Sequence, residues 1–281
     1  MIQCNNVVKA FNKNKVIKGI NLNLENGKIT SLVGKNGAGK STLIGLIMGY
    51  YRCDSGTITK DKVSVMPDAA SMYPTWSGIE FLKFMSQLKG AEFSEALELA
   101  SRLGIKDKLK NKISDFSFGM KKKLSFIQCA IGSYQSYIFD EPTSGVDVPS
   151  ALIMLDIIKE LKSNGSAVLL TSHNIDELER VSDYIYIIES GYITQQGSVE
   201  EIINNKVGGL VYCLVSPQAE SLSQALELQK YIRSFQNQEL ELIFSDSLEA
   251  SAILKELIAS YTISEFYQKK RSLIESVYEK L

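Results

Sequence analysis

The chain has 281 residues, of which 44% are hydrophobic and 22% are charged, the composition of an ordinary soluble globular protein. Its 31 Lys and Arg nearly balance its 32 Asp and Glu, which disfavours a nucleic-acid-binding protein, since such proteins more often carry a basic domain. The sequence shows no signal peptide, no apolar run of the roughly 18–20 residues that span a bilayer, and no metal-ligand spacing among its cysteines. We therefore expect a cytoplasmic chain.

The N-terminal part predicts strands at residues 2–9, 16–25 and 29–33. The third strand leads through a glycine-rich turn into a helix at 40–48. A short hairpin is predicted at 56–66.

Helices and strands alternate in the middle of the chain. Apolar residues recur at helical spacing from residue 76 to residue 132. The elements expected after them are strands at 137–139, 167–171 and 184–188, and helices at about 149–163 and 175–181. This alternation predicts an α/β fold with a mainly parallel sheet that is covered on both faces.

The composition changes at Gly208 and Gly209, which mark a linker, and we place a domain boundary between residues 205 and 206. Residues 206–281 predict the order strand, helix, strand, strand, helix, strand, followed by a last helix at 273–281. That order is typical of a small ferredoxin-like α+β domain.

The sequence GKNGAGKST at residues 34–42 matches the phosphate-loop pattern G-x-x-x-x-G-K-[ST]. Its glycines let the backbone turn tightly and direct consecutive N–H groups at phosphate oxygens. The helix that begins there adds its positive N-terminal end. We expect Lys40 to reach the β- and γ-phosphates of a nucleotide, and the Ser41 hydroxyl to ligate magnesium.

Two acidic residues follow the apolar strand at 137–139. Asp140 is expected at the carboxyl edge of the sheet, where it suits a partner of magnesium, and Glu141 can hold an attacking water as a general base. An acidic pair before Pro142 could instead simply begin a turn. The phosphate loop upstream favours the catalytic interpretation.

The only histidine, His173, follows the strand at 167–171. An isolated histidine is more often structural, but its place at the sheet edge favours contact with the γ-phosphate or the water. Phe11 lies between two predicted strands, where it either stacks on a nucleotide base or packs within a hairpin.

In the segment 117–120, Ser117 can cap a helix and Gly119 lets backbone N–H groups approach an anion. The lysines at 121–123 are interpreted as a solvated helix face rather than a binding patch.

In this order the motifs of residues 1–205 resemble the nucleotide-binding subunit of ABC transporters. Phe11 resembles the A-loop aromatic, 34–42 the Walker A loop, 117–120 the signature motif, 137–140 Walker B, 144–147 the D-loop, and His173 the switch histidine. The resemblance implies a RecA-like P-loop core with an antiparallel β subdomain and a helical subdomain at about 76–132.

The resemblance also implies ATP and Mg²⁺ as ligands. The implied ATP-binding residues are Phe11, Gly34, Asn36, Gly37, Gly39, Lys40, Ser41, Thr42, Ser117, Gly119 and Asp147. The implied catalytic residues are Lys40, Glu141 and His173, and the implied magnesium-binding residues are Ser41, Asp68 and Asp140.

The family pattern implies a sandwich of two copies, in which each ATP lies between residues 34–42 of one subunit and Ser117 and Gly119 of the other. Closing it would move an integral membrane permease at the cytoplasmic face of the membrane. The tail SLIESVYEKL is similar to those of drug- and peptide-exporter ATPases of Gram-positive bacteria. We therefore expect an exporter of a drug, an antimicrobial peptide or another amphipathic cargo.

Two positions depart from the family pattern. Phe118 stands where many relatives carry glycine, and Asp68 stands at the Q-loop position, which is usually Gln. The aromatic residues of 72–85 either line a groove for a permease helix or form the core of the helical subdomain.

Two other functions are less consistent with the sequence. A non-transport ABC ATPase of DNA repair or translation would carry a long coiled-coil insertion or a second cassette, and neither is present. The intact Lys40, Asp140, Glu141 and His173 argue against a module that binds ATP without turnover.

Overall fold

The computed structural model describes residues 1–67, 72–204, 210–269 and 273. They belong to two compact units, Met1–Val199 and Glu200–Leu281, and each unit is described by itself. None of the helices in these residues combines the length and the apolar character needed to cross a bilayer. The domain boundary predicted after residue 205 lies outside the described residues and stays a prediction.

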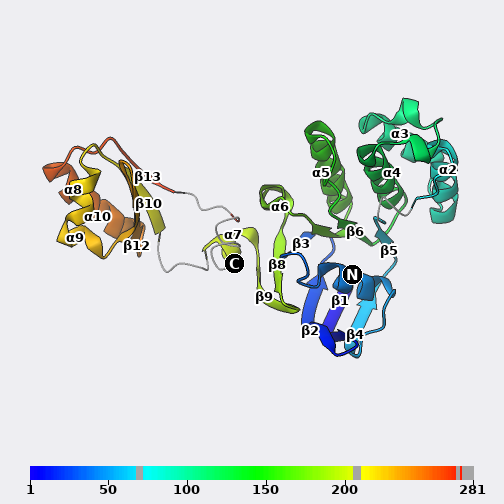
Figure 1. The fold of residues 1–281 in the computed structure, drawn as a ribbon, viewed down its shortest axis with the longest axis horizontal. Coiled ribbons are helices and arrows are strands. Elements are labelled where there is room, and N and C mark those ends of the chain that lie inside the picture. Colours follow the sequence, from blue (N-terminus) through cyan, green and yellow to red (C-terminus); the bar gives the residue numbers. More distant parts are fainter. Residues whose placement is uncertain (68–71, 205–209, 270–272, 274–281) are drawn as a thin grey trace. The chain divides into compact units, whose positions relative to one another are not determined.

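A six-stranded sheet forms the centre of the first unit, with strand order β5-β6-β7-β3-β8-β9 (Figure 1). Its strands are β3 (Ile29–Val33), β5 (Val63–Val65), β6 (Ser136–Asp140), β7 (Ala167–Thr171), β8 (Tyr184–Glu189) and β9 (Tyr192–Gly197). The pairs are parallel except that β9 runs antiparallel to β8. Every residue of β3 and β7 is buried, as a parallel sheet covered on both faces requires, so the predicted α/β fold is confirmed.

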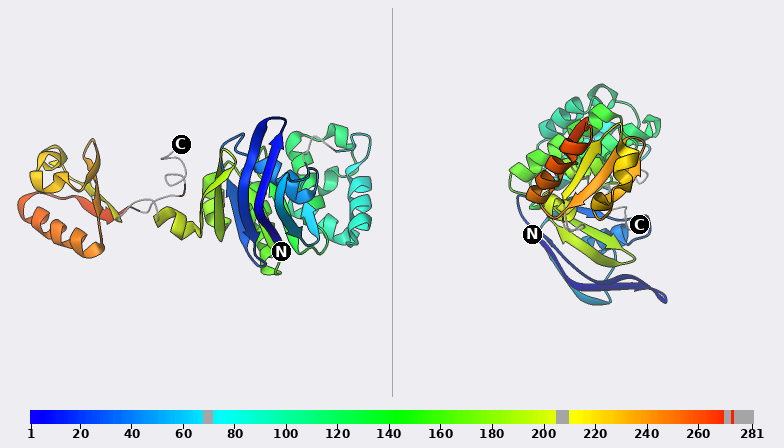
Figure 2. Two further views of the ribbon diagram at one scale, coloured as in Figure 1. Left: turned by 90° about the horizontal axis from the view of Figure 1, so that it is seen from below. Right: turned by 90° about the vertical axis from the view of Figure 1, so that its left-hand side faces the viewer.

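A three-stranded antiparallel sheet, with order β2-β1-β4, forms a second layer of this unit (Figure 2). Its strands are β1 (Ile2–Phe11), β2 (Asn14–Leu24) and β4 (Ser55–Lys60). The hairpin predicted at 56–66 is wrong, because β4 pairs with β1 whereas β5 pairs with β6 of the other sheet. The mostly exposed residues of β4 suit an edge strand, and the chain crosses between the sheets at Asp61 and Lys62.

Helix α1 (Lys40–Met48) packs between the two sheets, where Leu43 and Ile47 join a buried cluster with residues of both. The region predicted as helical at 76–132 contains α2 (Gly78–Lys89), α3 (Phe93–Arg102) and α4 (Phe118–Ala130). Helix α2 begins with a reciprocal capping box between Ser77 and Glu80. Helices α5 (Val148–Ser163) and α6 (Ile175–Val181) follow strands β6 and β7 of the six-stranded sheet.

The second unit contains a four-stranded antiparallel sheet with order β11-β12-β10-β13. Its strands are β10 (Leu210–Val215), β11 (Ile232–Gln236), β12 (Glu239–Phe244) and β13 (Glu265–Gln268). The crossovers contain α8 (Ala219–Gln224) with α9 (Leu226–Gln229), and α10 (Ser247–Ser260). The chain order is that of the predicted ferredoxin-like domain, although two short helices replace its first predicted helix.

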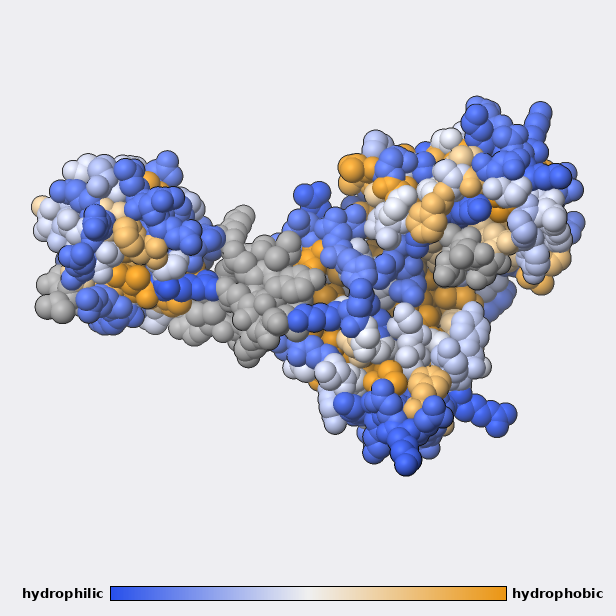
Figure 3. Space-filling view, in the orientation of Figure 1, coloured by the Kyte–Doolittle hydropathy of each residue, from blue (hydrophilic) through white to orange (hydrophobic). Residues whose placement is uncertain are grey.

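The sequence did not predict β9 or α7 (Val199–Asn204). Strand β9 has no continuous apolar run, since its exposed and partly buried residues alternate at the edge of the sheet. The helix predicted at 273–281 lies outside the described residues except for Leu273. In the space-filling view, hydrophilic residues cover most of the visible face of each unit, with hydrophobic residues scattered among them (Figure 3).

Candidate functional site

The phosphate loop connects β3 to α1 and uses its glycines for two different reasons. Gly37 and Gly39 have φ of +79° and +115°, in the left-handed region that favours glycine. Gly34 is required for space instead, because a Cβ there would lie 2.3 Å from the main-chain oxygen of Ile188 in β8. The N-cap residue of α1 is Gly39, which has no side chain to cap the helix, so the first N–H groups of α1 remain available to an anion.

Lys40 is the first residue of α1, and only 7% of its surface is exposed. Its Nζ donates hydrogen bonds to the main-chain oxygens of Gly34 at 2.6 Å and Lys35 at 3.3 Å. Burial lowers the pKa of Lys40 from its ordinary value, and the nearby carboxylates of Glu141 and Asp140 oppose that shift. A partly desolvated ammonium held by carbonyl oxygens is suited to an anionic ligand.

Asp140 ends β6, and Glu141 follows it at the carboxyl edge of the sheet. Thr171, at the end of the neighbouring β7, donates its hydroxyl to Asp140 Oδ1 and accepts a hydrogen bond from the Glu141 N–H at 3.0 Å. Glu141 has a φ of +50°, a conformation that costs a residue with a side chain on the order of 1–2 kcal/mol. The end of β7 therefore fixes both acidic residues.

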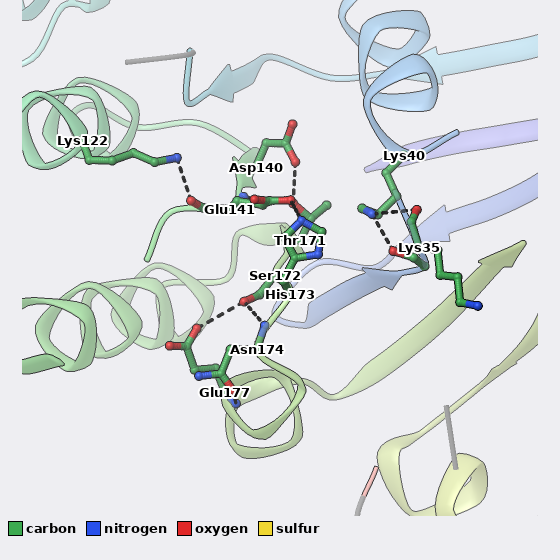
Figure 4. Close-up of polar contacts among 11 residues, drawn as sticks. Lys35, Lys40, Lys122, Asp140, Glu141, Thr171, Ser172, His173, Asn174 and Glu177 are labelled. Atoms are coloured by element: carbon green, nitrogen blue, oxygen red, sulfur yellow. Dashed lines mark hydrogen bonds and ion pairs between the residues drawn. The ribbon is translucent and has the colours of Figure 1, made fainter. Parts of the chain in front are cut away.

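His173 lies beside Glu141, with 2.6 Å between His173 Nε2 and Glu141 Oε1. Figure 4 shows Lys40 on one side of the site and Asp140, Glu141 and His173 on the other. Three residues that follow β7 in the chain are fixed by one another, since Ser172 Oγ donates to Glu177 Oε2 at 3.3 Å and accepts from the Asn174 N–H at 3.0 Å. The side chain of His173 is half exposed and contacts Glu141 rather than the core.

A cavity of about 240 Å³ opens at this edge of the sheet. The residues that line it are Val16, Lys35, Asn36, Gly37, Gly39, Lys40, Ser41, Thr42 and Glu141. The structure thus brings the predicted phosphate loop and the predicted general base to one cavity, although 100 residues separate Ser41 from Glu141 in the chain.

Besides Gly34, four predicted ATP-binding residues are not among those that line this cavity. Phe11 ends β1, and its ring lies edge-on to Tyr51 at a centroid distance of 5.2 Å. Ser117 caps α4 by accepting a hydrogen bond from the Met120 N–H at 3.2 Å, and Gly119 lies in the first turn of that helix.

The fourth of these residues, Asp147, caps α5 through the Ser150 N–H at 2.9 Å and pairs with Lys123 Nζ at 2.9 Å. These contacts, the Lys123 contact foremost, hold the pKa of Asp147 well below its usual range. Asp68, predicted to bind magnesium, lies outside the described residues.

The interpretation of residues 121–123 as a simple solvated face is wrong. Lys122 Nζ donates to the main-chain oxygen of Glu141 at 2.7 Å, and the Lys123 side chain is only 12% exposed in its ion pair with Asp147. These contacts are tertiary, so the spacing of three consecutive lysines gave no signal of them.

Two further supports were also missed. Glu177 accepts from Thr143 Oγ1 at 2.7 Å as well as from Ser172, and so connects the loops that follow β6 and β7. In the β8–β9 turn, the Gly191 N–H donates to Ala38 O at 3.0 Å, and Gly191 O accepts from the Lys18 N–H at 2.9 Å. This turn therefore connects the phosphate loop to β2.

Comparison with known proteins identifies the family. A family model described as "ABC transporter" matches residues 17–144. The linearmycin resistance ATP-binding protein LnrL of Bacillus subtilis (strain 168) is 31% identical over 284 residues, which cover 94% of this chain and 90% of that protein. The chain belongs to the ATP-binding subunits of ABC transporters. Members of this family bind ATP and hydrolyse it to power transport, so the chain is an ATPase.

Other ABC proteins extend the comparison. The lantibiotic transport ATP-binding protein SrtF of Streptococcus pyogenes is 30% identical to this ABC subunit over 223 residues. The aligned region covers 74% of this chain and 97% of SrtF. A solved ATP-binding subunit of an ABC transporter shares the fold with a TM-score of 0.69 at 23% identity, over 73% of this chain and 92% of that one. ABC ATP-binding subunits dimerise and work with membrane permease components.

Proposed function

We propose that this chain is the ATP-hydrolysing subunit of a bacterial exporter that moves a drug, an antimicrobial peptide or another amphipathic molecule through a separate permease. The observation that carries the proposal is the cavity that Lys40 and Glu141 share, which joins a phosphate-binding loop to a general base. The names of the relatives support the cargo class, since LnrL is a linearmycin resistance protein and SrtF a lantibiotic transport protein.

In this proposal the phosphate loop holds the triphosphate of ATP. Lys40 binds the β- and γ-phosphates, and the N–H groups from Gly34 to Thr42, with those of Asn36, Gly37 and Gly39 among them, surround the phosphate oxygens. The proposed role of Phe11 is to stack on the adenine, for which its exposed ring at the end of β1 is suited.

Glu141 is proposed to hold the attacking water and accept its proton, with His173 orienting the Glu141 carboxylate across their 2.6 Å contact. Within the described residues, no three His, Cys, Asp or Glu side chains gather to hold a metal ion. Magnesium in phosphate-transfer sites needs only one or two protein oxygens besides phosphates and water, and Ser41 and Asp140 fit that requirement. Bound there, Mg²⁺ would neutralise charge on the phosphates, and Asp68 is proposed as a further partner.

The ATPase is proposed to work as a homodimer. Ser117, Gly119 and Asp147 do not line the cavity of their own chain, and Ser117 and Asp147 are exposed. A second copy could present its α4 N-terminus to the ATP held by the first, where helix N–H groups would stabilise the charge of the transition state. The proposed location is the cytoplasmic face of the membrane, through the permease, and no nucleic acid is expected as a partner.

Replacing the base tests the proposal. Glu141→Gln keeps the size of the side chain but removes its basicity, so we expect ATP hydrolysis by the purified chain to fall by roughly 100-fold or more while ATP binding remains. Size-exclusion chromatography with ATP and Mg²⁺ should then reveal a stable dimer. Glu98→Gln, on the exposed face of α3, is the matched control and should behave as the wild type. Hydrolysis by Glu141→Gln near the wild-type rate would remove Glu141 from this role.

A further inference from the structure

Helix α4 contacts both ends of the loop that joins β6 to α5 (residues 141–147). Lys122 Nζ donates to the main-chain oxygen of Glu141 at 2.7 Å, which Figure 4 shows, and Lys123 Nζ pairs with Asp147 Oδ2 at 2.9 Å. Between these contacts, the ring of Phe118 lies so close to Gly145 that a Cβ there would be 2.6 Å from it. One helix therefore holds the first, the middle and the last part of this loop.

The Lys122 contact acts on a backbone that is strained. Glu141 has a φ of +50°, in a region that residues with a side chain seldom occupy, and Pro142 restricts its conformation further. On one side its N–H is held by Thr171, through the main-chain oxygen at 3.1 Å and Oγ1 at 3.0 Å. On the other side its carbonyl is held by the ammonium of Lys122. Because the available side-chain rotamers depend on the backbone angles, these contacts also limit where the carboxylate points.

We propose that Lys122 is a positioning residue for Glu141. It does not touch the reacting atoms in this arrangement; its ammonium keeps the Glu141 carbonyl in place, and with it the direction of the carboxylate. The inference rests on the proposed function, in which Glu141 is the general base.

The position of Lys122 on α4 has a consequence for the proposed dimer. Lys122 follows Gly119 by three residues, so the two lie on the same face of the helix. Gly119 is proposed to bind the ATP of the partner subunit, whereas Lys122 holds the base of its own subunit. A shift of α4 on binding the partner's ATP would therefore reach Glu141 directly, which links the two ATP sites.

The test compares three variants of the full-length chain. Lys122→Met keeps the length of the side chain but removes the donor, and Lys122→Arg keeps a donor. Lys121→Met is the matched control, because within the part of the chain that the structure describes the Lys121 side chain makes no hydrogen bond or ion pair with the loop, unlike Lys122 and Lys123. The measurements are kcat and KM for ATP, the midpoint of thermal unfolding, and hydrogen exchange of the amides of residues 141–147 without nucleotide.

For Lys122→Met we expect kcat to fall roughly 10- to 100-fold, since misplacing a catalytic group by about 1 Å costs that much. KM and the unfolding midpoint should stay near the wild-type values, and exchange in residues 141–147 should accelerate. Lys122→Arg should restore most of kcat, and Lys121→Met should match the wild type.

Unchanged kcat and unchanged exchange in Lys122→Met would overturn the inference, as would an equal loss of kcat in Lys121→Met. A loss of kcat accompanied by a matching loss of ATP binding and thermal stability would also overturn it, in favour of a merely structural role. If the wild-type chain itself failed to hydrolyse ATP, the proposed function would fall, whereas the exchange comparison would still decide whether Lys122 holds the loop.

Discussion

The substitution Gly34→Ala tests whether close packing on β8 sets the position of the phosphate loop. The new Cβ would lie 2.3 Å from the main-chain oxygen and 2.8 Å from Cγ2 of Ile188, whereas ordinary contacts begin at 3.4 Å. The loop or β8 must therefore move by about 1 Å, because a main-chain oxygen cannot rotate away as a flexible side chain can.

The expected magnitudes follow from that movement. Overpacking of this kind costs about 1–3 kcal/mol, which corresponds to a fall of about 2–12 °C in the unfolding midpoint of a unit of this size. Lys40 Nζ bonds to Gly34 O at 2.6 Å, so a displaced loop also displaces the ammonium. Since a misplacement of about 1 Å can reduce a rate by roughly 100-fold, we expect a loss of that order in kcat/KM for ATP.

The assay combines thermal unfolding with steady-state ATP hydrolysis. Gly27→Ala is the control, because Gly27 has a φ of +70° but no atom within 4 Å of its added Cβ. It should lose about 1–2 kcal/mol of stability through its backbone conformation alone and keep its activity. Gly34→Ala with an unchanged midpoint and unchanged kcat/KM would show that Gly34 is not held by packing on Ile188.

Two further substitutions address other parts of the chain. Burial lowers the pKa of Lys89 from 10.5 to about 8, so between these values the unfolded chain keeps a proton that the native state has released. The contribution of Lys89 to the free energy of unfolding therefore rises with pH in this window, and Lys89→Met should remove that rise. Chemical unfolding of both proteins across the window checks this, and a difference between them that does not change with pH would contradict it. Phe118 is 57% exposed at the N-terminus of α4, so Phe118→Gly should cost only about 1 kcal/mol of stability. It should raise the turnover of ATP if the ring obstructs the partner's nucleotide, and a turnover at or below the wild-type rate would reject that steric explanation.

The sequence predicted the parts of the fold that depend on local pattern. Strands β3 and β7 are runs of buried residues, and the phosphate loop lies between β3 and α1 as its motif requires. The hairpin at 56–66 failed because a pattern identifies a strand but not its partner. Both halves of that segment form strands, yet β4 pairs with β1. Strand β5 pairs instead with β6, which lies more than 70 residues further along the chain.

The candidate site shows the same division. Lys40, Glu141 and His173 could be found from their motifs, because each follows a strand at the same edge of the sheet. Lys122, Glu177 and Gly191 could not, because each acts through a contact with a distant segment. The left-handed conformation of Glu141 also has no sequence signal, since a glycine or asparagine would be the usual residue there.

The contacts of Gly191 matter for anyone who wishes to alter this protein. Exposed turns between strands are ordinarily the safest places to insert a tag or a fluorescent reporter. At the β8–β9 turn, however, the added segment would separate Ala38 from Lys18, which Gly191 joins, and an added Cβ would already approach Val16 O to 2.2 Å. An insertion there would loosen the phosphate loop without changing any residue that lines the cavity.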